Sequence, residues 1–236
     1  MSDPAGLSDV WVIVRCYNEA QVVAPVVSEL RETFPNVVGV DDASVDGSDV
    51  VLRRAGATVV RHSVHLGAGA ALQTGIEFTL RDPKARYLVC FDADGQHRVT
   101  DAADMVGVAR GADLDMVIGS RFLGTAPVGM PHTRRVVLRA GRLFERVATG
   151  IRLSDAHNGL RVLSRRFASS LDLASVDMSY ATELLQAAHR SGARYAEHPV
   201  EIRYNAYTMA KGERSINSVN IAFDVIVTAL LGRRQR

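Results

Sequence analysis

Two carboxylates stand one residue apart directly after an apolar stretch of the sequence. Residues 87–91 form a near-continuous apolar run, which predicts a strand covered on both faces, and Asp92-Ala93-Asp94 follows it without a break. Mg²⁺ and Mn²⁺ prefer oxygen ligands, and Mg²⁺ commonly takes one or two protein carboxylates together with substrate phosphates. The spacing therefore predicts a partial site for Mg²⁺ or Mn²⁺, whose missing ligands would be a diphosphate and water.

Two further polar residues follow this acidic pair. Gln96 and His97 are within reach of the same site, and we predict both as members of it, although a solvent-exposed side chain is an equal alternative for His97. A competing interpretation is that Asp92 and Asp94 only cap the next helix. We disfavour it because Thr100 is predicted to cap that helix.

A second acidic pair ends another predicted strand. Asp41 and Asp42 follow residues 37–40, and a turn rich in Ser, Asp and Gly then opens a helix. Carboxylates in this place can accept hydrogen bonds from a base or from ribose hydroxyls. We therefore predict Asp41 and Asp42 as nucleoside contacts, whereas Asp46 or Ser48 is better interpreted as the cap of the following helix.

Strands that alternate with helices must hold these acidic pairs. The alternation predicts an α/β fold, a single nucleotide-binding Rossmann-like domain with a mostly parallel central sheet flanked by helices. Ligands then bind at the carboxyl ends of the strands, which is where both acidic pairs lie. The predicted strands are residues 10–16, 37–40, 57–61, 87–91, 116–118, 160–163 and 194–204, and the predicted helices are residues 19–34, 47–55, 68–81, 100–110, 133–149 and 179–190.

The composition excludes several classes of protein. The chain has 236 residues, 47% of them hydrophobic, and can therefore bury one substantial core. A net charge of +2 gives no general footprint for nucleic acid. Cys16 and Cys90 each lie in an apolar run, so the sequence predicts neither a disulfide nor a cysteine-based zinc site.

Neither terminus carries a pattern that crosses a membrane. The N-terminus lacks the basic flank and apolar stretch of a signal peptide, and the apolar run 219–231 is shorter than the roughly 20 residues that span a bilayer. We therefore expect a cytoplasmic protein that is at most peripheral on the inner face of the membrane. The apolar stripe of this C-terminal segment is best explained by packing onto the domain, with membrane-surface contact or a homodimer as alternatives.

Five motifs in order resemble those of family 2 glycosyltransferases. Within the family they look most like the branch of dolichyl-phosphate mannose synthase and its bacterial polyprenyl-phosphate relatives. The resemblance implies a GT-A fold, a divalent metal on the Asp-x-Asp motif and inversion at the anomeric carbon. It divides the chain into an N-terminal tail (1–9), a catalytic domain (10–205), and a mobile loop with an amphipathic C-terminal helix (206–236). The motifs are Arg15-Cys16-Tyr17-Asn18-Glu19 and the segments 40–48, 66–71, 91–97 and 119–122.

The resemblance also implies roles for single residues. Arg121 would meet a phosphate, which suits its planar guanidinium. Asp155 would lie near the acceptor, and Glu183 resembles a later acidic position of the family, so these three are the expected catalytic residues. The expected nucleotide and phosphate contacts are Tyr17, Asn18, Glu19, Asp41, Asp42, Gly67, Asp92, Arg121, Arg161, Lys211 and Arg214.

The acceptor decides whether the reaction needs a base. A sugar or metabolite hydroxyl needs a general base, whereas a lipid phosphate is already an anion and needs only positioning and cations. Asp155 is the best base candidate, with a turn or helix cap as its alternative, and Arg161, Lys211 and Arg214 could hold an acceptor phosphate. Polyprenyl phosphate is the leading acceptor through the resemblance, and a UDP-hexose is favoured over GDP-mannose as the donor.

Other classes of protein fit less well. Gly67-Ala68-Gly69-Ala70-Ala71 imitates part of a dinucleotide phosphate loop, but it lacks the third glycine and follows the third strand instead of the first. A sugar-phosphate nucleotidyltransferase is the closest alternative. It should carry a glycine-rich loop with Arg and Lys after the first strand, where Tyr17-Asn18-Glu19 stands instead. The presence of both aspartates of the Asp-x-Asp motif argues against a non-catalytic module.

Overall fold

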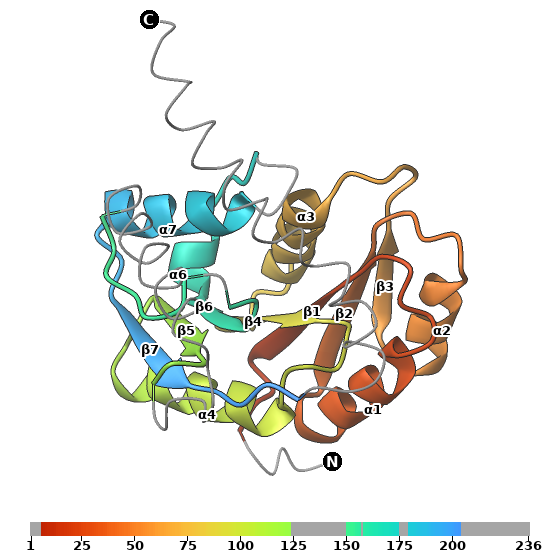
Figure 1. The fold of residues 1–236 in the computed structure, drawn as a ribbon, viewed down its shortest axis with the longest axis horizontal. Helices are drawn as coiled ribbons and strands as arrows, with labels where there is room; N and C mark the ends of the chain where they lie inside the picture. The colour runs from red at the N-terminus through yellow and green to blue at the C-terminus, as the bar shows by residue number, and fades with distance from the viewer. Residues whose placement is uncertain (1–5, 124–149, 157, 175–178, 204–236) are drawn as a thin grey trace, which may run out of the picture. The chain divides into compact units, whose positions relative to one another are not determined.

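Seven strands form one sheet in the order β3-β2-β1-β4-β6-β5-β7 in the computed structural model, which describes residues 6–123, 150–156, 158–174 and 179–203 (Figure 1). Strand β6 runs antiparallel to both of its neighbours, and the other strands are parallel to one another. This arrangement confirms the predicted α/β fold with a mostly parallel sheet. The strands are β1 (Val10–Cys16), β2 (Asn36–Asp41), β3 (Thr58–Arg61), β4 (Tyr87–Asp92), β5 (Met116–Ser120), β6 (Arg161–Ser164) and β7 (Tyr195–Pro199).

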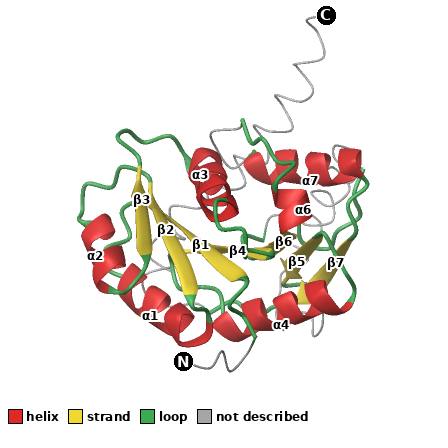
Figure 2. Cartoon of the chain, turned by 180° about the vertical axis from the view of Figure 1, so that it is seen from behind, coloured by secondary structure: helices red, strands yellow, loops and turns green. Residues whose placement is uncertain are grey.

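Helices cover both faces of the sheet. Helices α1, α2 and α4 pack on one face, and α3, α6 and α7 pack on the other, as Figures 1 and 2 show from opposite sides. All of these elements lie within residues 1–202, which form one unit. The helices are α1 (Val23–Thr33), α2 (Ser48–Arg54), α3 (Ala68–Leu80), α4 (Val99–Gly111), α6 (Arg165–Ala168) and α7 (Tyr180–Ser191).

The apolar run of β1 is explained by this double cover. Val12 and Val14 point into the core beneath α1 and α4, whereas Ile13 points into the core beneath α3 and α7. All three side chains are fully buried. Helix α3 comes close to the sheet at Gly75, where a Cβ atom would lie 2.3 Å from Cγ2 of Ile13. Glycine is therefore needed at this position for the observed packing.

The order of the strands places a ligand site between β1 and β4. The chain continues from β1 to β2 on one side, while β4 joins β1 on the other side, so the direction of winding reverses there. Ligands of open α/β sheets bind at such a switch point, outside the carboxyl ends of the strands. Arg15 near the end of β1 lies opposite Asp92 at the end of β4. The Asp-x-Asp motif therefore stands at the edge where the topology predicts a site.

Several element boundaries differ from the sequence prediction. The first helix begins at Val23 instead of residue 19, because residues 20–22 form turns and the carbonyl of Glu19 accepts hydrogen bonds from the N–H groups of Val22 and Val23. The prediction that Thr100 caps the next helix is wrong: α4 begins at Val99, and its N-cap residue makes no side-chain hydrogen bond.

Two further differences lie in the second half of the chain. The last predicted strand ends at Pro199 instead of residue 204, and the short helix α6 was not predicted. Both cysteines are free and buried, as expected. None of the described helices is long and apolar enough to span a bilayer. The predicted helix over residues 133–149 and the C-terminal amphipathic helix lie outside the described residues.

Candidate active site

The first carboxylate of the Asp-x-Asp motif is held by basic side chains. The guanidinium of Arg15 donates to Asp92 and to the hydroxyl of Tyr180 on α7, and Nε2 of His97 lies 3.1 Å from Oδ2 of Asp92. Burial acts to raise the pKa of Asp92, but the charge of Arg15 and the hydrogen bond with His97 outweigh it, so this pKa lies well below its ordinary value. Asp92 is therefore ionised and fixed in orientation.

The second carboxylate lies in a different electrostatic environment. Burial, and after it the charge of Asp92, raise the pKa of Asp94 above its ordinary value. Its Oδ1 accepts a hydrogen bond from the backbone N–H of Gln96 at 3.0 Å, and no basic side chain of the described part of the chain bonds to it. A carboxylate whose charge is disfavoured in this way gains from a cation placed beside it. The chemistry of the pair thus fits a divalent metal.

The described side chains do not form a metal site by themselves. Across the described ranges, no group of three or more His, Cys, Asp or Glu residues has an arrangement that could hold a metal ion. The expected partial site, to which a diphosphate would add ligands, stays a prediction. His97 is 6% exposed, so the alternative of a solvent-exposed histidine is wrong, and its ring instead bonds to Asp92. The roles of Gln96 and His97 as metal ligands stay predictions.

The close approach of Gly159 to Asp92 is a feature of the site that the sequence did not predict. A Cβ atom at this position would lie 2.0 Å from Oδ2 of Asp92, so the backbone of the segment before β6 packs directly against the carboxylate. In the sequence, Gly159 belongs to the segment 155–161, which the family resemblance places near the acceptor, but no local pattern connects Gly159 with Asp92. Only the pairing of β4 with β6 brings them together.

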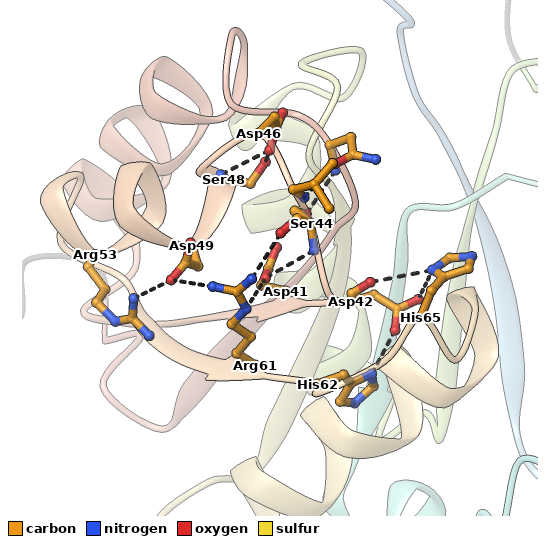
Figure 3. Close-up of polar contacts among 12 residues, drawn as sticks. Asp41, Asp42, Ser44, Asp46, Ser48, Asp49, Arg53, Arg61, His62 and His65 are labelled. Carbon is orange, nitrogen blue, oxygen red and sulfur yellow. Dashed lines mark hydrogen bonds and ion pairs between the residues drawn. The ribbon is translucent and has the colours of Figure 1, made fainter.

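Asp42 organises the loop that follows β3. Its carboxylate accepts hydrogen bonds from the N–H groups of Leu66 at 2.8 Å and Gly67 at 2.7 Å. It also bonds to Nδ1 of His62 at 2.7 Å and of His65 at 2.8 Å (Figure 3). Burial opposes the charge, but these hydrogen bonds lower the pKa of Asp42 below its ordinary value. Asp42 and Gly67, both predicted nucleotide contacts, are thereby brought together.

Asp41 is fully buried and bonds within the protein. Its Oδ2 lies 3.3 Å from Nε of Arg61 and accepts from the N–H of Ser44 at 3.3 Å, and Arg61 also reaches Asp49 at 3.2 Å (Figure 3). Because no part of Asp41 faces solvent, the structure does not bring it to a position for nucleoside contact, and that role stays a prediction.

The expected cap of α2 is displaced by one residue. The N-cap residue is Gly47, and Asp46 accepts hydrogen bonds from the N–H of Ser48 at 3.0 Å and from its hydroxyl at 2.6 Å. The other oxygen of Asp46 accepts from the N–H of Ala20 at 2.9 Å, and the hydroxyl of Ser48 accepts from the N–H of Glu19 at 2.9 Å. Both residues therefore tie the start of α2 to the loop after β1.

The loop after β1 presents an exposed aromatic surface. Tyr17 is 44% exposed, and its ring stacks on that of His65 with centroids 4.0 Å apart and planes 23° apart. The next two residues face the neighbouring loop: Oδ1 of Asn18 accepts from the N–H of Val45 at 3.0 Å, and Glu19 is 7% exposed. The flat face of Tyr17 suits a stacked base, which is consistent with its predicted place in the nucleotide pocket.

The expected catalytic residues Arg121 and Asp155 bond to one another. Nε and Nη2 of Arg121 donate to the two oxygens of Asp155 at 2.6 and 2.8 Å, and the backbone N–H of Arg121 adds a third hydrogen bond at 3.1 Å. Asp155 is 3% exposed, whereas the side chain of Arg121 is 39% exposed. Such a two-pronged pair fixes the plane of the guanidinium just beyond the end of β5.

The motifs of this site match a family of known proteins. A family model described as Glycosyl transferase family 2 matches residues 11–171, which is more than half of the chain. The chain belongs to glycosyltransferase family 2. The match covers β1 to β6 and includes every motif from Arg15 to Asp155, so the sequence-based assignment of the family is confirmed, and nothing supports a nucleotidyltransferase.

Two relatives of this glycosyltransferase have names that describe them as transferases for a lipid phosphate. The undecaprenyl-phosphate mannosyltransferase of Micrococcus luteus is 31% identical over 81% of this chain and 82% of its own. The UDP-N-acetylglucosamine–dolichyl-phosphate N-acetylglucosaminyltransferase of Methanococcus voltae is 25% identical over 94% of this chain and 95% of its own.

A solved structure confirms the GT-A fold of the glycosyltransferase. Glucosyl-3-phosphoglycerate synthase from Mycobacterium tuberculosis, solved in complex with Mn²⁺ and UDP-glucose, superimposes with a TM-score of 0.67 at 18% identity. The match covers 98% of this chain and 80% of that chain. At this identity the likeness establishes the fold alone.

The remaining predicted site residues of the glycosyltransferase have structural partners. Arg161 is 1% exposed, and its guanidinium donates to the carbonyls of Ala156 at 2.9 Å and Asn158 at 3.1 Å, so it shapes the segment before β6 instead of facing solvent. Oε1 of Glu183 accepts from the N–H of Ala174 at 3.0 Å. Their expected contacts with substrate stay predictions, and Lys211 and Arg214 lie outside the described residues.

Proposed function

We propose that this glycosyltransferase moves a hexose from a nucleotide diphosphate sugar to an acceptor phosphate, and that the acceptor is a polyprenyl phosphate. The observation that carries the proposal is the pairing of Asp155 with Arg121. A hydroxyl acceptor would need a general base, and Asp155 was the best candidate for it. Since both oxygens of Asp155 already accept hydrogen bonds from Arg121, its function is to hold that guanidinium.

An acceptor phosphate removes the need for a base. A phosphate oxygen is already an anion, so it can attack the anomeric carbon directly while the bond from that carbon to the diphosphate breaks and the nucleoside diphosphate leaves with the electron pair. The enzyme then has to position the two anions and neutralise their charge. Arg121 is partly exposed, and its plane is fixed by Asp155, so it is suited to bind the acceptor phosphate.

Asp92 and Asp94 would hold a Mg²⁺ or Mn²⁺ ion in this proposal. When bound there, the metal neutralises charge on the departing diphosphate. The support from the chain itself is that Asp94 has a raised pKa next to an ionised Asp92. A solved neighbour of the same fold binds Mn²⁺ together with UDP-glucose.

The proposed donor is a UDP-hexose, with GDP-mannose as the alternative. Tyr17 offers a stacking surface for either base, next to the loop that Asp42 organises. Two of the proteins compared above carry a uridine nucleotide in their names or bound to them, and the third transfers mannose. A polyprenyl acceptor resides in a membrane, so the proposal includes peripheral contact with a membrane surface; a homodimer stays a prediction.

Transfer assays with paired acceptors test this proposal. The full chain would be incubated with labelled UDP-glucose, UDP-N-acetylglucosamine or GDP-mannose, with Mg²⁺, Mn²⁺ or EDTA, and with either undecaprenyl phosphate or undecaprenol. We expect one donor to label undecaprenyl phosphate only when metal is present, and no labelling of undecaprenol. Comparable transfer to the alcohol would show that a base operates, and it would contradict the proposal.

A pair of matched variants tests whether Asp94 is needed for metal-dependent binding of the donor. Asp94→Asn should abolish metal-dependent binding of the donor, because it removes the charge that the cation compensates. Asp104→Asn is the control, since Asp104 is an exposed carboxylate on the following helix α4. If Asp94→Asn binds donor and metal as the wild type does, the assignment of the site is wrong.

A further inference from the structure

Glu197 on β7 binds the segment that carries Asp155. Its Oε1 accepts hydrogen bonds from the N–H of Ser154 at 2.8 Å, from the hydroxyl of Ser154 at 2.8 Å and from the N–H of Asp155 at 3.1 Å, and Oε2 lies 2.9 Å from the N–H of Ser154. The carboxylate of Glu197 thus accepts hydrogen bonds from two consecutive backbone N–H groups and from one hydroxyl. Hydrogen bonds to an ionised acceptor are stronger than those between neutral groups.

The same serine also joins this segment to the strand end that carries Arg121. The hydroxyls of Ser154 and Ser120 lie 2.5 Å apart, and Ser120, the last residue of β5, accepts from the N–H of Phe122 at 3.2 Å. Glu197 lies on β7, which pairs with β5 in parallel register. The carboxylate of Glu197 therefore bonds directly to the backbone of Asp155, and through the hydroxyl of Ser154 it is linked to Ser120, next to Arg121.

We propose that Glu197 is a positioning residue for sugar transfer: it fixes Asp155 in the place from which Asp155 orients Arg121 toward the acceptor phosphate. The inference rests on the proposed function, in which Arg121 binds that phosphate. Residues 150–156 make no strand or helix of their own, so side-chain contacts must hold them. Glu197 supplies these contacts from a strand of the sheet, which is a rigid support for the site.

Variants of Glu197 separate positioning from general stability. Glu197→Met keeps the approximate size of the side chain and removes the acceptor oxygens. Glu197→Gln keeps one oxygen, which can accept the hydrogen bonds that Oε1 accepts in the wild type. Glu201→Met is the control, because Glu201 follows the same strand and pairs with Arg98 at 2.5 Å through an exposed ion pair away from Asp155.

Two measurements on each variant would be made. The first is steady-state transfer to undecaprenyl phosphate together with the Kd of the donor. We expect Glu197→Met to raise the KM for the acceptor phosphate by about tenfold or more, with kcat and the donor Kd near the wild-type values. Glu197→Gln should restore most of the acceptor affinity, and Glu201→Met should behave as the wild type.

The second measurement needs no substrate. The Nε–H proton of Arg121, assigned by NMR through its loss in Arg121→Lys, should exchange slowly in the wild type and in Glu201→Met, and faster in Glu197→Met. If undecaprenyl phosphate proves not to be a substrate, the proposed function fails while this exchange rate still reports on the positioning by Glu197.

The outcomes that overturn the inference are specific. Unchanged protection of the Arg121 Nε–H in Glu197→Met would show that Glu197 does not fix the pair. An equal loss of donor and acceptor affinity would show a general structural role. If Glu197→Met does not fold, Ser154→Ala removes only the hydroxyl that bonds to Glu197 and Ser120, and it should shift acceptor KM and Nε–H exchange in the same direction by about threefold. No shift in Ser154→Ala would equally refute the inference.

Discussion

Replacing Asp155 by Asn distinguishes a positioning carboxylate from a catalytic base. Asp155→Asn keeps the size of the side chain but removes its charge, and it places an NH₂ group against one of the two donors of Arg121. The guanidinium then loses one of its two fixed hydrogen bonds and can rotate away from the plane that Asp155 sets. If the acceptor phosphate binds to Arg121, its affinity falls, whereas the chemical step itself is little changed.

The size of the effect follows from the burial of the two partners. Removing one partner of a fully buried ion pair costs about 3–5 kcal/mol, and an exposed pair contributes about 1 kcal/mol or less. Asp155 is 3% exposed but Arg121 is 39% exposed, so water recovers part of the loss. We therefore expect Asp155→Asn to weaken binding of the acceptor phosphate by about 2 kcal/mol. At about 1.4 kcal/mol per tenfold, this corresponds to a roughly 30-fold rise in the KM of the acceptor phosphate.

The assay is transfer from the preferred donor at varied undecaprenyl phosphate, which gives kcat and KM separately. Asp115→Asn is the control, because Asp115 is also a buried aspartate, 7% exposed, but it bonds to Arg166 at 2.6 Å near the opposite end of β5. It should lower stability and leave the acceptor KM unchanged. If Asp155→Asn instead lowers kcat by a factor of about 100 or more, as expected for loss of a general base, and leaves KM unchanged, the reasoning is refuted.

Two further predictions concern the stability of the fold. Gly75→Ala should destabilise the protein by about 1–2 kcal/mol in urea unfolding, because overpacking against Cγ2 of Ile13 costs more than the roughly 1 kcal/mol gained in helix propensity; a gain in stability would contradict the observed packing. Because the pKa of Asp42 is lowered in the folded state, its contribution to stability is present above the ordinary pKa of about 3.9 and is lost as the pH falls through the lowered value. Thermal unfolding between about pH 5 and 3 should therefore depend less on pH in Asp42→Asn than in the wild type, and equal slopes would show that these hydrogen bonds contribute nothing.

Local patterns in the sequence were sufficient to predict most of the sheet and the acidic pairs. The run of Val12, Ile13 and Val14 predicts a strand because both of its faces are covered, and the structure places helices on both. Asp92 and Asp94 could be found because carboxylates directly after a buried strand contribute nothing to its apolar packing and are costly to bury without a partner. These signals are contained within a few neighbouring residues.

Contacts between distant segments could not be predicted in the same way. The four residues of β6 carry no signal for their antiparallel direction, which depends on the strands on either side. The pairing of Asp155 with Arg121, which lie 34 residues apart, has no signal in the sequence, and it is the reason why we propose that Asp155 holds the guanidinium instead of acting as a base. Glu197 has no motif that marks it, since its partner Ser154 lies 43 residues away. Such residues are recognised only when the fold brings them together.

The antiparallel strand β6 also sets an order in which the enzyme can be built. β5 pairs only with β6 and β7 among the described strands, and both follow it in the chain, whereas β1 to β4 complete their mutual pairing by residue 92. As the chain is synthesised, β1 to β4 can therefore pair with one another before either neighbour of β5 has been made. Asp155 lies six residues before β6, so its contact with Arg121 requires a part of the chain that is made after β5. The pair of Asp155 and Arg121 thus depends on the later part of the chain, and a chain that ended before residue 155 would carry the Asp-x-Asp motif without this pair.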